Sequence, residues 1–417
     1  MTDLEEKLLQ VNMAGRTLAE LSDPKKQAVL FDLAVEIGIQ AEYILLENKK
    51  DLAHMDPSNP TYDRLLLNPE RLDSFVEDIK NVALLPSPVG NILEDKVMEN
   101  GLKISRVSVP FGVIGIVYEA RPNVTLDFFS LCFKSGNACV LKGGSDAKFS
   151  NLAIVNLIHN VLNKHGISKD IIYLLSNDKE ILKEMMQAVG FIDIIIPRGS
   201  RRLIDFVRDN AKVPVIETGA GIVHTYVDLS ADIDMAKNIV TNAKIRRVSV
   251  CNALDTLIIH ESQLDNLYTI ISALPGYKVE VFADEKSFQN LQDKYPEGLL
   301  HHATDESFGT EFLSYKMSIK TVSNLKEAVG HIEKYSSKHS EAIISSNQKN
   351  IDYFLTYVDA GVVYVNTSTA FTDGTQFGLG AEIGVSTQKL HARGPMALQA
   401  LTSYKWIVRG DGQIRDK

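Results

Sequence analysis

The N-terminal part of the chain has the hydrophobic pattern of amphipathic helices. Apolar residues recur at helical spacing throughout residues 1–54, as in LEEKLLQVNMAGRTLAEL. Asp23 followed by Pro24 predicts the start of the second helix, because a capping side chain before proline is typical of a helix N-terminus. A proline-containing loop is predicted at residues 57–60, and helical spacing resumes as far as about Val82.

After Gly101 the pattern changes to strands that alternate with helices. Residues 102–120 alternate between apolar and polar positions and then become a continuous apolar run, which predicts a hairpin-like strand entering a buried strand. The following rhythm predicts βαβ units and a mostly parallel sheet with covered faces. Strands are predicted at ACVLKGG (138–144), IIYLLS (171–176), FIDIIIPRG (191–199) and VPVIE (213–217), and helices at 151–166, 179–190 and 200–211.

A second α/β region follows. Residues 230–245 predict a helix that is capped by Ser230 or Asp232. Further strands are predicted at LDTLIIH (254–260), KVEVFAD (278–284) and MSIKTV (317–322), a helix at 325–336, and a strand-like run at LTSYKWIVRG (401–410).

The composition is that of an ordinary globular protein. The 417 residues are 45% hydrophobic and 23% charged, and this length predicts two or three domains. The net charge of -9 argues against bulk nucleic-acid binding, although a local basic cleft can still hold a small anion. Because no signal-peptide pattern and no run of about 18 apolar residues is present, we expect no membrane span. The 3 cysteines do not suggest a disulfide framework, so we expect a cytoplasmic protein with reduced thiols.

Cys251 is the first candidate for chemistry. It follows a predicted helix and precedes a predicted strand, at a kind of junction where side chains point into clefts. Arg246 and Arg247 lie just upstream, and positive charge lowers the pKa of a thiol. Cys132 and Cys139 instead lie in an apolar helix-to-strand passage and are expected to be small buried hydrophobic residues, which is also the alternative for Cys251.

Two turns between a strand and a helix are candidate phosphate sites. The turn PRGS contains Gly199 and Ser200, and its free N–H groups would point at an anion from a helix N-terminus. It is not the GxGxxG pattern, so an ordinary turn remains the alternative. In LKGGSDA, Lys142 ends a strand beside two glycines, at the strand end where ligands of parallel sheets bind.

Two further segments are candidates for ligand binding. In YEARPNVT, Asn123 can donate to a developing oxyanion and Arg121 can hold a phosphate or carboxylate, with a simple turn as the alternative. The segment FGLGAEIGVSTQKLHARGP (377–395) combines four glycines with basic side chains, which indicates either a loop over a site or a flexible surface loop. No CxxC pair, HExxH or P-loop spacing occurs, so we expect no metal.

Four of these motifs together resemble a known family. PFGVIGIVYEARPNVT, LKGG, SVCNALDTLIIH and FGLGAEIGVSTQKLHARGP, in this order and spacing, are similar to the gamma-glutamyl phosphate reductases (glutamate-5-semialdehyde dehydrogenases). These form the proline-biosynthesis branch of the aldehyde dehydrogenase superfamily. The resemblance spans nearly the whole chain.

The resemblance implies an α/β, aldehyde dehydrogenase-like architecture. It implies a Rossmann-like NADP-binding domain at residues 1–228 with 366–400, and an α/β catalytic domain at 229–365. A small β element, made of a hairpin at 97–110 and a tail at 401–417, would serve oligomerisation. We therefore expect a homo-oligomer acting on a small molecule, and the prediction includes association with glutamate 5-kinase.

The resemblance also implies roles for individual residues. Cys251 would be the nucleophile and Asn123 the oxyanion donor. The cofactor would be NADP(H), with Lys142 and Ser145 at the adenosine ribose and its 2′-phosphate. Gly199 and Ser200 would face the pyrophosphate, and Glu311 would hold the nicotinamide ribose. The predicted substrate-binding residues are Arg121, Arg246, His391 and Arg393.

The implied reaction is the NADPH-dependent reduction of L-glutamyl 5-phosphate to L-glutamate 5-semialdehyde and phosphate. The Cys251 thiolate would attack the acyl phosphate, and a thioester would accept the hydride. Asn123 and the Cys251 N–H would stabilise the oxyanion, a contact that contributes about 3 kcal/mol per donor. Phosphate leaves without a proton, so no strong general acid is needed.

Three departures from the family pattern leave alternatives open. This chain has IRRVSVCNA with Arg246 and Val248 where the family usually has TQRPSVCNA, ETGAG (217–221) in place of EHGDG, and Ala370 in place of the arginine of STRF. One alternative keeps the scaffold but changes the substrate to another acyl phosphate or to an aldehyde. The other is a catalytically silent relative that serves as a scaffold or as a partner of the upstream kinase.

Overall fold

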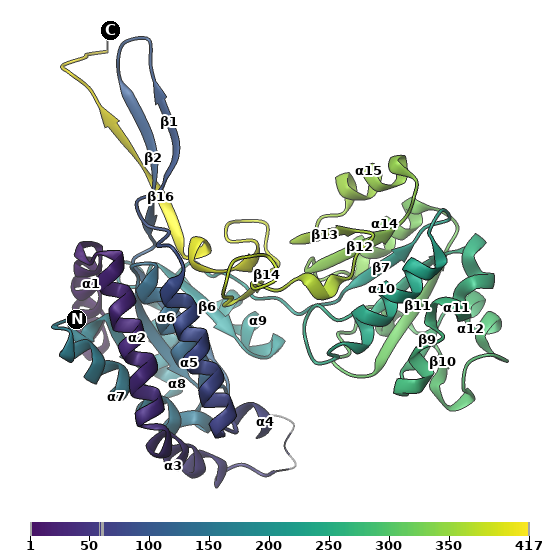
Figure 1. Cartoon of the computed structure of the whole chain (residues 1–417), viewed down its shortest axis with the longest axis horizontal. Coiled ribbons are helices and arrows are strands. Elements are labelled where there is room, and N and C mark those ends of the chain that lie inside the picture. Colours follow the sequence, from purple (N-terminus) through teal and green to yellow (C-terminus); the bar gives the residue numbers. More distant parts are fainter. Residues whose placement is uncertain (1, 58, 60–61, 416–417) are drawn as a thin grey trace. The chain divides into compact units, whose positions relative to one another are not determined.

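The computed structural model describes residues 2–57, 59 and 62–415. Pro60 of the predicted loop and residues 416–417 of the predicted tail lie outside the described residues. The chain forms two compact units (Figure 1). The first unit comprises residues 1–218, 379–384 and 396–417, and the second unit comprises residues 219–378 and 385–395.

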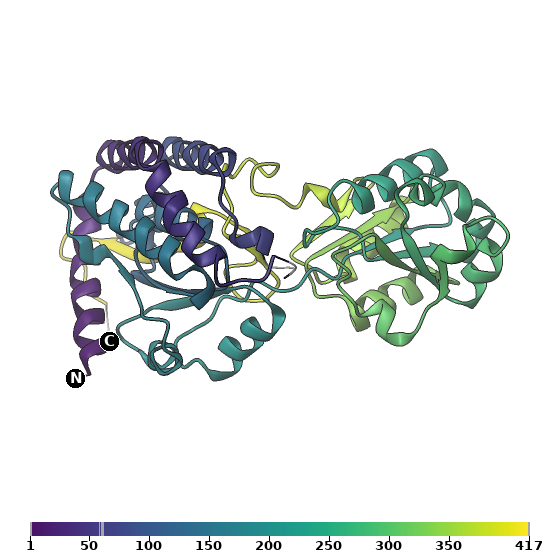
Figure 2. The same ribbon diagram turned by 90° about the horizontal axis from the view of Figure 1, so that it is seen from below.

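The first unit is built on a parallel sheet with the strand order β5-β4-β3-β6. Every residue of β3 (Val113–Tyr118) and β4 (Ala138–Gly143) is buried, as the continuous apolar runs predict for strands covered on both faces. Helices surround this sheet (Figures 1 and 2). The other elements are α1 (Asp3–Thr17), α2 (Asp23–Ile39), α3 (Ala41–Leu52), α4 (Tyr62–Leu65), α5 (Pro69–Leu84), α6 (Asn123–Lys134), α7 (Lys148–Lys164), β5 (Ile172–Leu174), α8 (Lys179–Gln187), β6 (Ile194–Arg198) and α9 (Arg201–Asn210).

A three-stranded antiparallel ribbon extends from the first unit (Figure 1). It consists of β1 (Ile92–Val97), β2 (Lys103–Pro110) and β16 (Thr402–Arg409), with β2 in the middle. The pairing of β2 with β16 joins segments that are about 300 residues apart, from Thr402 opposite Pro110 to Arg409 opposite Lys103. Every residue of β1 except Glu94 is exposed, so one edge of the ribbon faces solvent.

The second unit contains a parallel sheet of seven strands in the order β10-β9-β11-β8-β7-β12-β13. Figure 2 shows its helices on both faces of the sheet. The strands are β7 (His224–Val227), β8 (Thr256–His260), β9 (Glu280–Ala283), β10 (Leu300–His302), β11 (Lys316–Val322), β12 (Ser340–Ile344) and β13 (Val362–Val365). The helices are α10 (Ile233–Ile245), α11 (Leu267–Ile271), α12 (Glu285–Leu291), α13 (Asp305–Phe308), α14 (Leu325–Tyr335) and α15 (Gln348–Tyr357).

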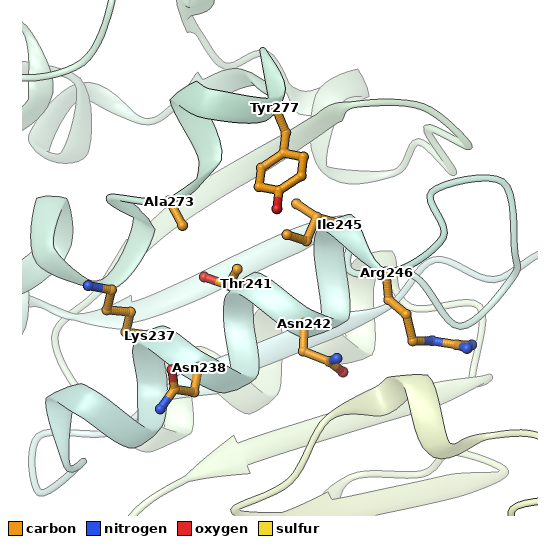
Figure 3. A pocket seen from close by; sticks show the side chains of 8 residues that line it. All are labelled: Lys237, Asn238, Thr241, Asn242, Ile245, Arg246, Ala273 and Tyr277. Atoms are coloured by element: carbon orange, nitrogen blue, oxygen red, sulfur yellow. The ribbon is translucent and has the colours of Figure 1, made fainter.

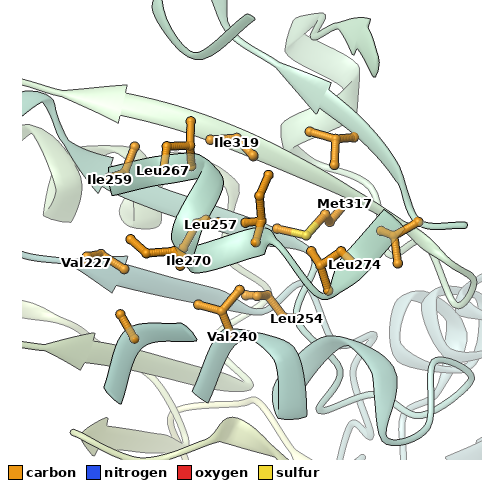
Figure 4. Close-up of a cluster of buried hydrophobic side chains, with 14 of the residues drawn as sticks. Val227, Val240, Leu254, Leu257, Ile259, Leu267, Ile270, Leu274, Met317 and Ile319 are labelled. Carbon is orange, nitrogen blue, oxygen red and sulfur yellow. The ribbon is translucent and has the colours of Figure 1, made fainter. Parts of the chain in front are cut away.

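The core of the second unit lies in two layers, one on each face of the sheet. Leu257 and Ile259 of β8 point into the cluster beneath α10 and α11 (Figure 4). Ile258, between them, points to the opposite cluster, where it meets α14 and α15. Successive side chains of a strand alternate between faces, so this apolar strand fills both layers.

The segment 377–395 carries short strands rather than a long flexible loop. It contains β14 (Gly384–Ser386) and β15 (Gly394–Met396), which pair with each other. Gly378 and Gly380 both have positive φ, a backbone conformation that side chains disfavour. Glycine is therefore needed here for chain geometry, which accounts for part of the glycine content of the segment.

The predicted α/β class with parallel sheets is confirmed, and two local predictions are wrong. VPVIE (213–217) forms only a single parallel bridge, from Val215 to Ile195, instead of a strand. Pro214 has no N–H to donate. Its only backbone group that can pair with the neighbouring strand is its carbonyl, which accepts from the N–H of Ile195. The second helix is capped by Ser22, which accepts from the backbone N–H of Lys25, and Asp23 is its first residue.

Candidate active site

The candidate residues of the first unit gather at the carboxyl ends of three neighbouring strands. Tyr118, the last residue of β3, is in register with Gly143 of β4 and Arg198 of β6. The segments that follow these strands carry Arg121 and Asn123, Ser145, and Gly199 with Ser200. Ligands of open parallel sheets bind at this edge, so the topology brings the predicted cofactor residues of this unit together.

The turn between β6 and α9 binds a carboxylate of the chain itself. Ser200 caps α9, and its backbone N–H and its hydroxyl donate to the two oxygens of Glu119, at 2.7 and 2.9 Å. A Cβ at Gly199 would lie 2.6 Å from the Glu119 carboxylate, so a side chain there would require Glu119 to shift. The predicted phosphate-binding turn thus holds a carboxylate of the chain, and Glu119 was not among the predicted site residues.

Lys142 is buried at the end of β4, with only 7% of its surface exposed. Its ammonium donates to the carbonyl of Gly143 at 3.3 Å, and burial lowers its pKa. Ser145 follows in a short 3-10 helix (Ser145–Ala147) and is exposed. Lys142 and Ser145 thus supply an ammonium and a hydroxyl at the strand end where ligands of parallel sheets bind.

Asn123 is the first residue of α6, and its side chain has a partner within the helix. Its amide donates to Asp127 at 3.0 Å, a pair at the i, i+4 spacing of helical neighbours. Desolvation raises the pKa of Asp127 to about 7, against the lowering effect of this hydrogen bond. Arg121 precedes α6 in the turn, and its carbonyl accepts from the N–H of Val124.

Cys251 lies in the second unit, at the amino end of its sheet. It is partly exposed, in contrast to the fully buried Cys132 and Cys139, so the buried-hydrophobe alternative is wrong for Cys251 and right for the other two. The residue stands in the loop between α10 and β8, as its sequence context predicts. Arg246 and Arg247 upstream are exposed.

Close backbone packing fixes the position of the Cys251 loop. A side chain at Gly221 would overlap the carbonyl oxygen of Cys251, so only glycine fits at this point of the ETGAG segment. The N–H of Gly221 donates to Glu311 at 2.8 Å. The nucleophile candidate and the predicted ribose-binding carboxylate therefore meet at the same turn.

The side chain of Asp255 is hydrogen-bonded to both segments that form this turn. Its carboxylate accepts from the N–H of Val223, two residues after Gly221, at 3.3 Å and from the N–H of Phe312, next to Glu311, at 2.9 Å. Lys244 is fully buried nearby and donates to the carbonyl of Leu254. Burial raises the pKa of Asp255 and lowers that of Lys244, and each charge opposes this effect on the other.

The loop that contains Ala370 is tied to the residue after the cysteine. The Asn252 amide donates to the carbonyl of Thr372 at 2.9 Å, and the Thr369 hydroxyl donates to the carbonyl of Asn252 at 2.9 Å. Ala370 is 9% exposed in this loop. The departure from the family pattern at this position thus lies beside the nucleophile loop.

Arg246 lines a pocket of about 460 Å³ along α10 (Figure 3). Asn238 and Asn242 line this pocket and also a second pocket of about 490 Å³ on the same helix. The first pocket is lined by Lys237, Asn238, Thr241, Asn242, Ile245, Arg246, Ala273 and Tyr277.

His391 and Arg393 lie near the C-terminal end of segment 377–395. Arg393 donates to Asp359 at 2.7 Å, and Lys389 donates to the same oxygen at 2.7 Å. These two cations hold the pKa of Asp359 far below its ordinary value. Arg393 is therefore engaged by a carboxylate in this structure, whereas His391 is exposed.

In the first unit the predicted residues follow neighbouring strand ends, whereas in the second unit only Cys251 and Glu311 meet at one turn. Arg246 lies along α10 and Arg393 binds Asp359. Glu119, Asp127, Asp255 and Lys244 were missed, although Glu119 lies inside the motif YEARPNVT. Among residues 2–57, 59 and 62–415, no helix is long and apolar enough to cross a membrane. The same described residues contain no group of three or more His, Cys, Asp or Glu that is arranged to hold a metal ion.

Comparison with known proteins shows full-length relatives. The chain is 60% identical over 412 residues to the gamma-glutamyl phosphate reductase of Pelodictyon phaeoclathratiforme, covering 99% of each chain. It superposes on the crystal structure of the gamma-glutamyl phosphate reductase from Thermotoga maritima with a TM-score of 0.94 at 41% identity, covering 99% of each chain. No family model matches the chain.

More distant structures share the fold alone. The glyceraldehyde-3-phosphate dehydrogenase GapN of Methanocaldococcus jannaschii, complexed with NADP, gives a TM-score of 0.66 at 16% identity, covering 97% of this chain and 94% of that chain. A propionaldehyde dehydrogenase of Rhodopseudomonas palustris, with bound CoA and an acylated cysteine, gives 0.67 at 13% identity, covering 97% and 96%. These likenesses confirm the aldehyde dehydrogenase-like fold, and the full-length relatives show that the chain belongs to the gamma-glutamyl phosphate reductases, a family of oxidoreductases.

Proposed function

We propose that this chain reduces L-glutamyl 5-phosphate to L-glutamate 5-semialdehyde and phosphate, the second step of proline biosynthesis from glutamate. The observation that carries the proposal is the 60% identity to a gamma-glutamyl phosphate reductase over 99% of both chains. The intact cysteine motif and the partial exposure of the Cys251 residue support it. The changes at Ala370 and in ETGAG leave both of these features in place.

Cys251 is the proposed nucleophile. Its thiolate adds to the acyl carbon, and the C–O bond to phosphate breaks, so that the leaving group takes the electron pair and the enzyme keeps a thioester. Asn123 and the N–H of Cys251 are the proposed donors to the oxyanion. When bound, NADPH would supply the hydride for the thioester carbon. The resulting thiohemiacetal then collapses, which releases the aldehyde and restores the Cys251 thiol.

The first unit has groups that fit a phosphorylated dinucleotide. The α9 N-terminus already accommodates a carboxylate, and Lys142 is a buried cation at the adjoining strand end. We therefore assign Lys142, Ser145, Gly199 and Ser200 to cofactor binding, and residues 1–228 with 366–400 to the cofactor domain. In the catalytic domain (229–365), Glu311 is assigned to the nicotinamide ribose. The NADP complex of a protein with the same fold is consistent with this choice of cofactor.

Basic side chains are proposed to hold the anionic ends of the substrate. Arg246 lines the α10 pocket, Arg121 lies beside Asn123, and His391 with Arg393 lies after the glycine-rich stretch. A guanidinium binds carboxylate and phosphate oxygens with two parallel hydrogen bonds. These four side chains would carry the recognition of the α-carboxylate and the phosphate.

The ribbon of β1, β2 and β16 is the proposed oligomerisation element. Tyr404, Trp406 and Val408 are each about half exposed on one face of β16, at 51%, 48% and 57%. Exposed apolar rows of this kind mark association surfaces. We therefore propose a homo-oligomer.

The reaction is tested in the direction of acyl-phosphate formation. Purified protein with glutamate 5-semialdehyde, NADP and phosphate should generate NADPH absorbance at 340 nm. Omission of phosphate should abolish the signal, because phosphate is the group that releases the acyl chain from the cysteine. Absence of turnover from a folded protein that binds NADPH would favour the scaffold alternative, and turnover of other aldehydes alone would favour a different substrate.

A further inference from the structure

The first turn of α9 carries the wrong charge for a helix without a ligand. Arg201 and Arg202 are its first two residues, and no acidic residue lies in the turn. The positive end of the helix dipole disfavours cations at this end and favours anions. Both arginines are exposed, and Arg201 also lies 3.8 Å from Asp205 in the next turn, so an anion in front of the helix would meet cationic side chains.

An anion already sits at this helix end, and it comes from the chain itself. Glu119 is the first residue after β3, and its backbone N–H donates to the carbonyl of Arg198 at 3.2 Å. This bond fixes the backbone of Glu119 beside the turn, where Ser200 donates to both oxygens of the Glu119 carboxylate. The contact joins residues 81 positions apart. Glu119 thus takes the N–H and hydroxyl donors that a phosphate at this helix end would use.

We propose that Glu119 is an internal, displaceable anion that competes with the cofactor's pyrophosphate for the N-terminus of α9 and so sets the affinity for NADPH. The inference rests on the proposed function, because it takes this turn as the pyrophosphate site. Two anions cannot accept from the same Ser200 N–H, and their charges repel each other. Cofactor binding therefore requires the Glu119 carboxylate to leave the turn, and this requirement lowers the apparent affinity.

The substitution Glu119→Gln separates the charge from the shape of this side chain. Glutamine keeps one acceptor oxygen for the Ser200 N–H, so the turn and α9 remain folded. It forms only neutral hydrogen bonds, which are weaker than the charge-assisted ones of glutamate. The variant should therefore bind NADPH more tightly than the wild type, by about tenfold, because its turn is vacated more readily.

Glu327 provides a matched control in the second unit. Its carboxylate also accepts from a serine N–H and hydroxyl at a helix end, those of Ser323 at 2.8 and 2.9 Å, but no predicted ligand residue lies there. Glu327→Gln removes the same kind of bond from a helix end with no assigned ligand. Its affinity for NADPH should equal that of the wild type.

The experiment measures dissociation constants by titration of NADPH fluorescence for wild type, Glu119→Gln and Glu327→Gln, each checked by its melting temperature. Inorganic pyrophosphate and adenosine 2′-phosphate, which lacks a pyrophosphate, are then titrated as competitors of NADPH. Tighter binding of NADPH and pyrophosphate by Glu119→Gln alone, with adenosine 2′-phosphate unchanged, is the expected result. Equal or weaker NADPH binding by Glu119→Gln would overturn the inference while leaving the proposed function intact. Failure of the wild type to bind any nicotinamide dinucleotide would overturn both.

Discussion

Asp127 is a single residue whose protonation ties stability to pH. Its pKa in the folded protein is about 7, whereas that of an unfolded aspartate is about 3.9. Between these pH values the folded protein holds a proton that the unfolded chain has released. The contribution of Asp127 to the free energy of unfolding is therefore most favourable below pH 4 and is lost as the pH rises to 7.

The substitution Asp127→Asn should remove this dependence. Asparagine keeps an acceptor for the Asn123 amide and has no proton to lose. Relative to the variant, the wild type should lose at most about 1.4 kcal/mol of unfolding free energy for each pH unit between 5 and 7. Urea unfolding of both proteins at pH 5 and pH 7 measures the difference. The same gap at both pH values would contradict the assigned pKa.

At this scale the sequence predicts residue types better than it predicts their partners. Cys251 and Asn123 stand out because their chemistry and their position in the chain agree. The Glu119–Ser200 contact joins residues 81 positions apart and depends on the register of β3 with β6, which no local pattern contains. Asp255 lies inside an apolar strand run, and its role depends on backbone N–H groups of other segments.

At the scale of elements, the carboxylate of Asp255 links the segments that precede β7, β8 and β11 through hydrogen bonds. Asp255→Asn leaves one acceptor for two N–H donors and leaves the Lys244 ammonium buried without a counter-charge. An unsatisfied buried polar group typically costs about 1–3 kcal/mol, and here a buried charge also loses its nearby opposite charge. We expect a lower free energy of unfolding and a higher KM for NADPH, because the turn holding Glu311 loses its support.

Asp284→Asn is the comparison for this prediction. Asp284 also binds a strand from within the second unit, accepting from the N–H and hydroxyl of Thr321 at 2.7 and 2.9 Å. It touches neither Gly221 nor Glu311. Both variants should unfold at lower urea concentration, and only Asp255→Asn should change KM. Equal KM changes in both would show that Asp255 acts only on stability.

The elements themselves follow from sequence where the pattern is long and regular. β3, β4 and β8 are predicted because continuous apolar runs between turns are typical of buried parallel strands. VPVIE has the same composition, but Pro214 lacks the N–H needed for a ladder, so residues 213–217 form a single bridge. The composition of an apolar run does not show whether it forms a strand. That depends on which of its N–H groups must pair with the neighbouring strand.

At the scale of the whole molecule, the ribbon is the proposed surface for association of copies of the chain. Tyr404, Trp406 and Val408 share one face of β16, where the Arg106 guanidinium lies 5.0 Å from the Tyr404 ring and 5.8 Å from the Trp406 ring. Val408→Glu would place an unpaired charge in the proposed interface. We expect light scattering to show a smaller particle for this variant.

The neighbouring substitution Lys405→Glu tests whether the effect belongs to that face. Lys405 alternates to the opposite face of β16 and is exposed. Its replacement should leave the particle mass unchanged. A monomeric wild type, or an unchanged mass for Val408→Glu, would refute the proposed role of the ribbon.

Covalent attachment of the substrate to the Cys251 thiol is the central step of the proposed reaction. The direct measurement is the formation of NADPH from glutamate 5-semialdehyde, NADP and phosphate by wild type and by Cys251→Ala. Since the side chain is partly exposed, the variant should fold with little change in melting temperature. The wild type is expected to turn over and Cys251→Ala to show none. Turnover by the alanine variant at a rate near that of the wild type would contradict the central claim.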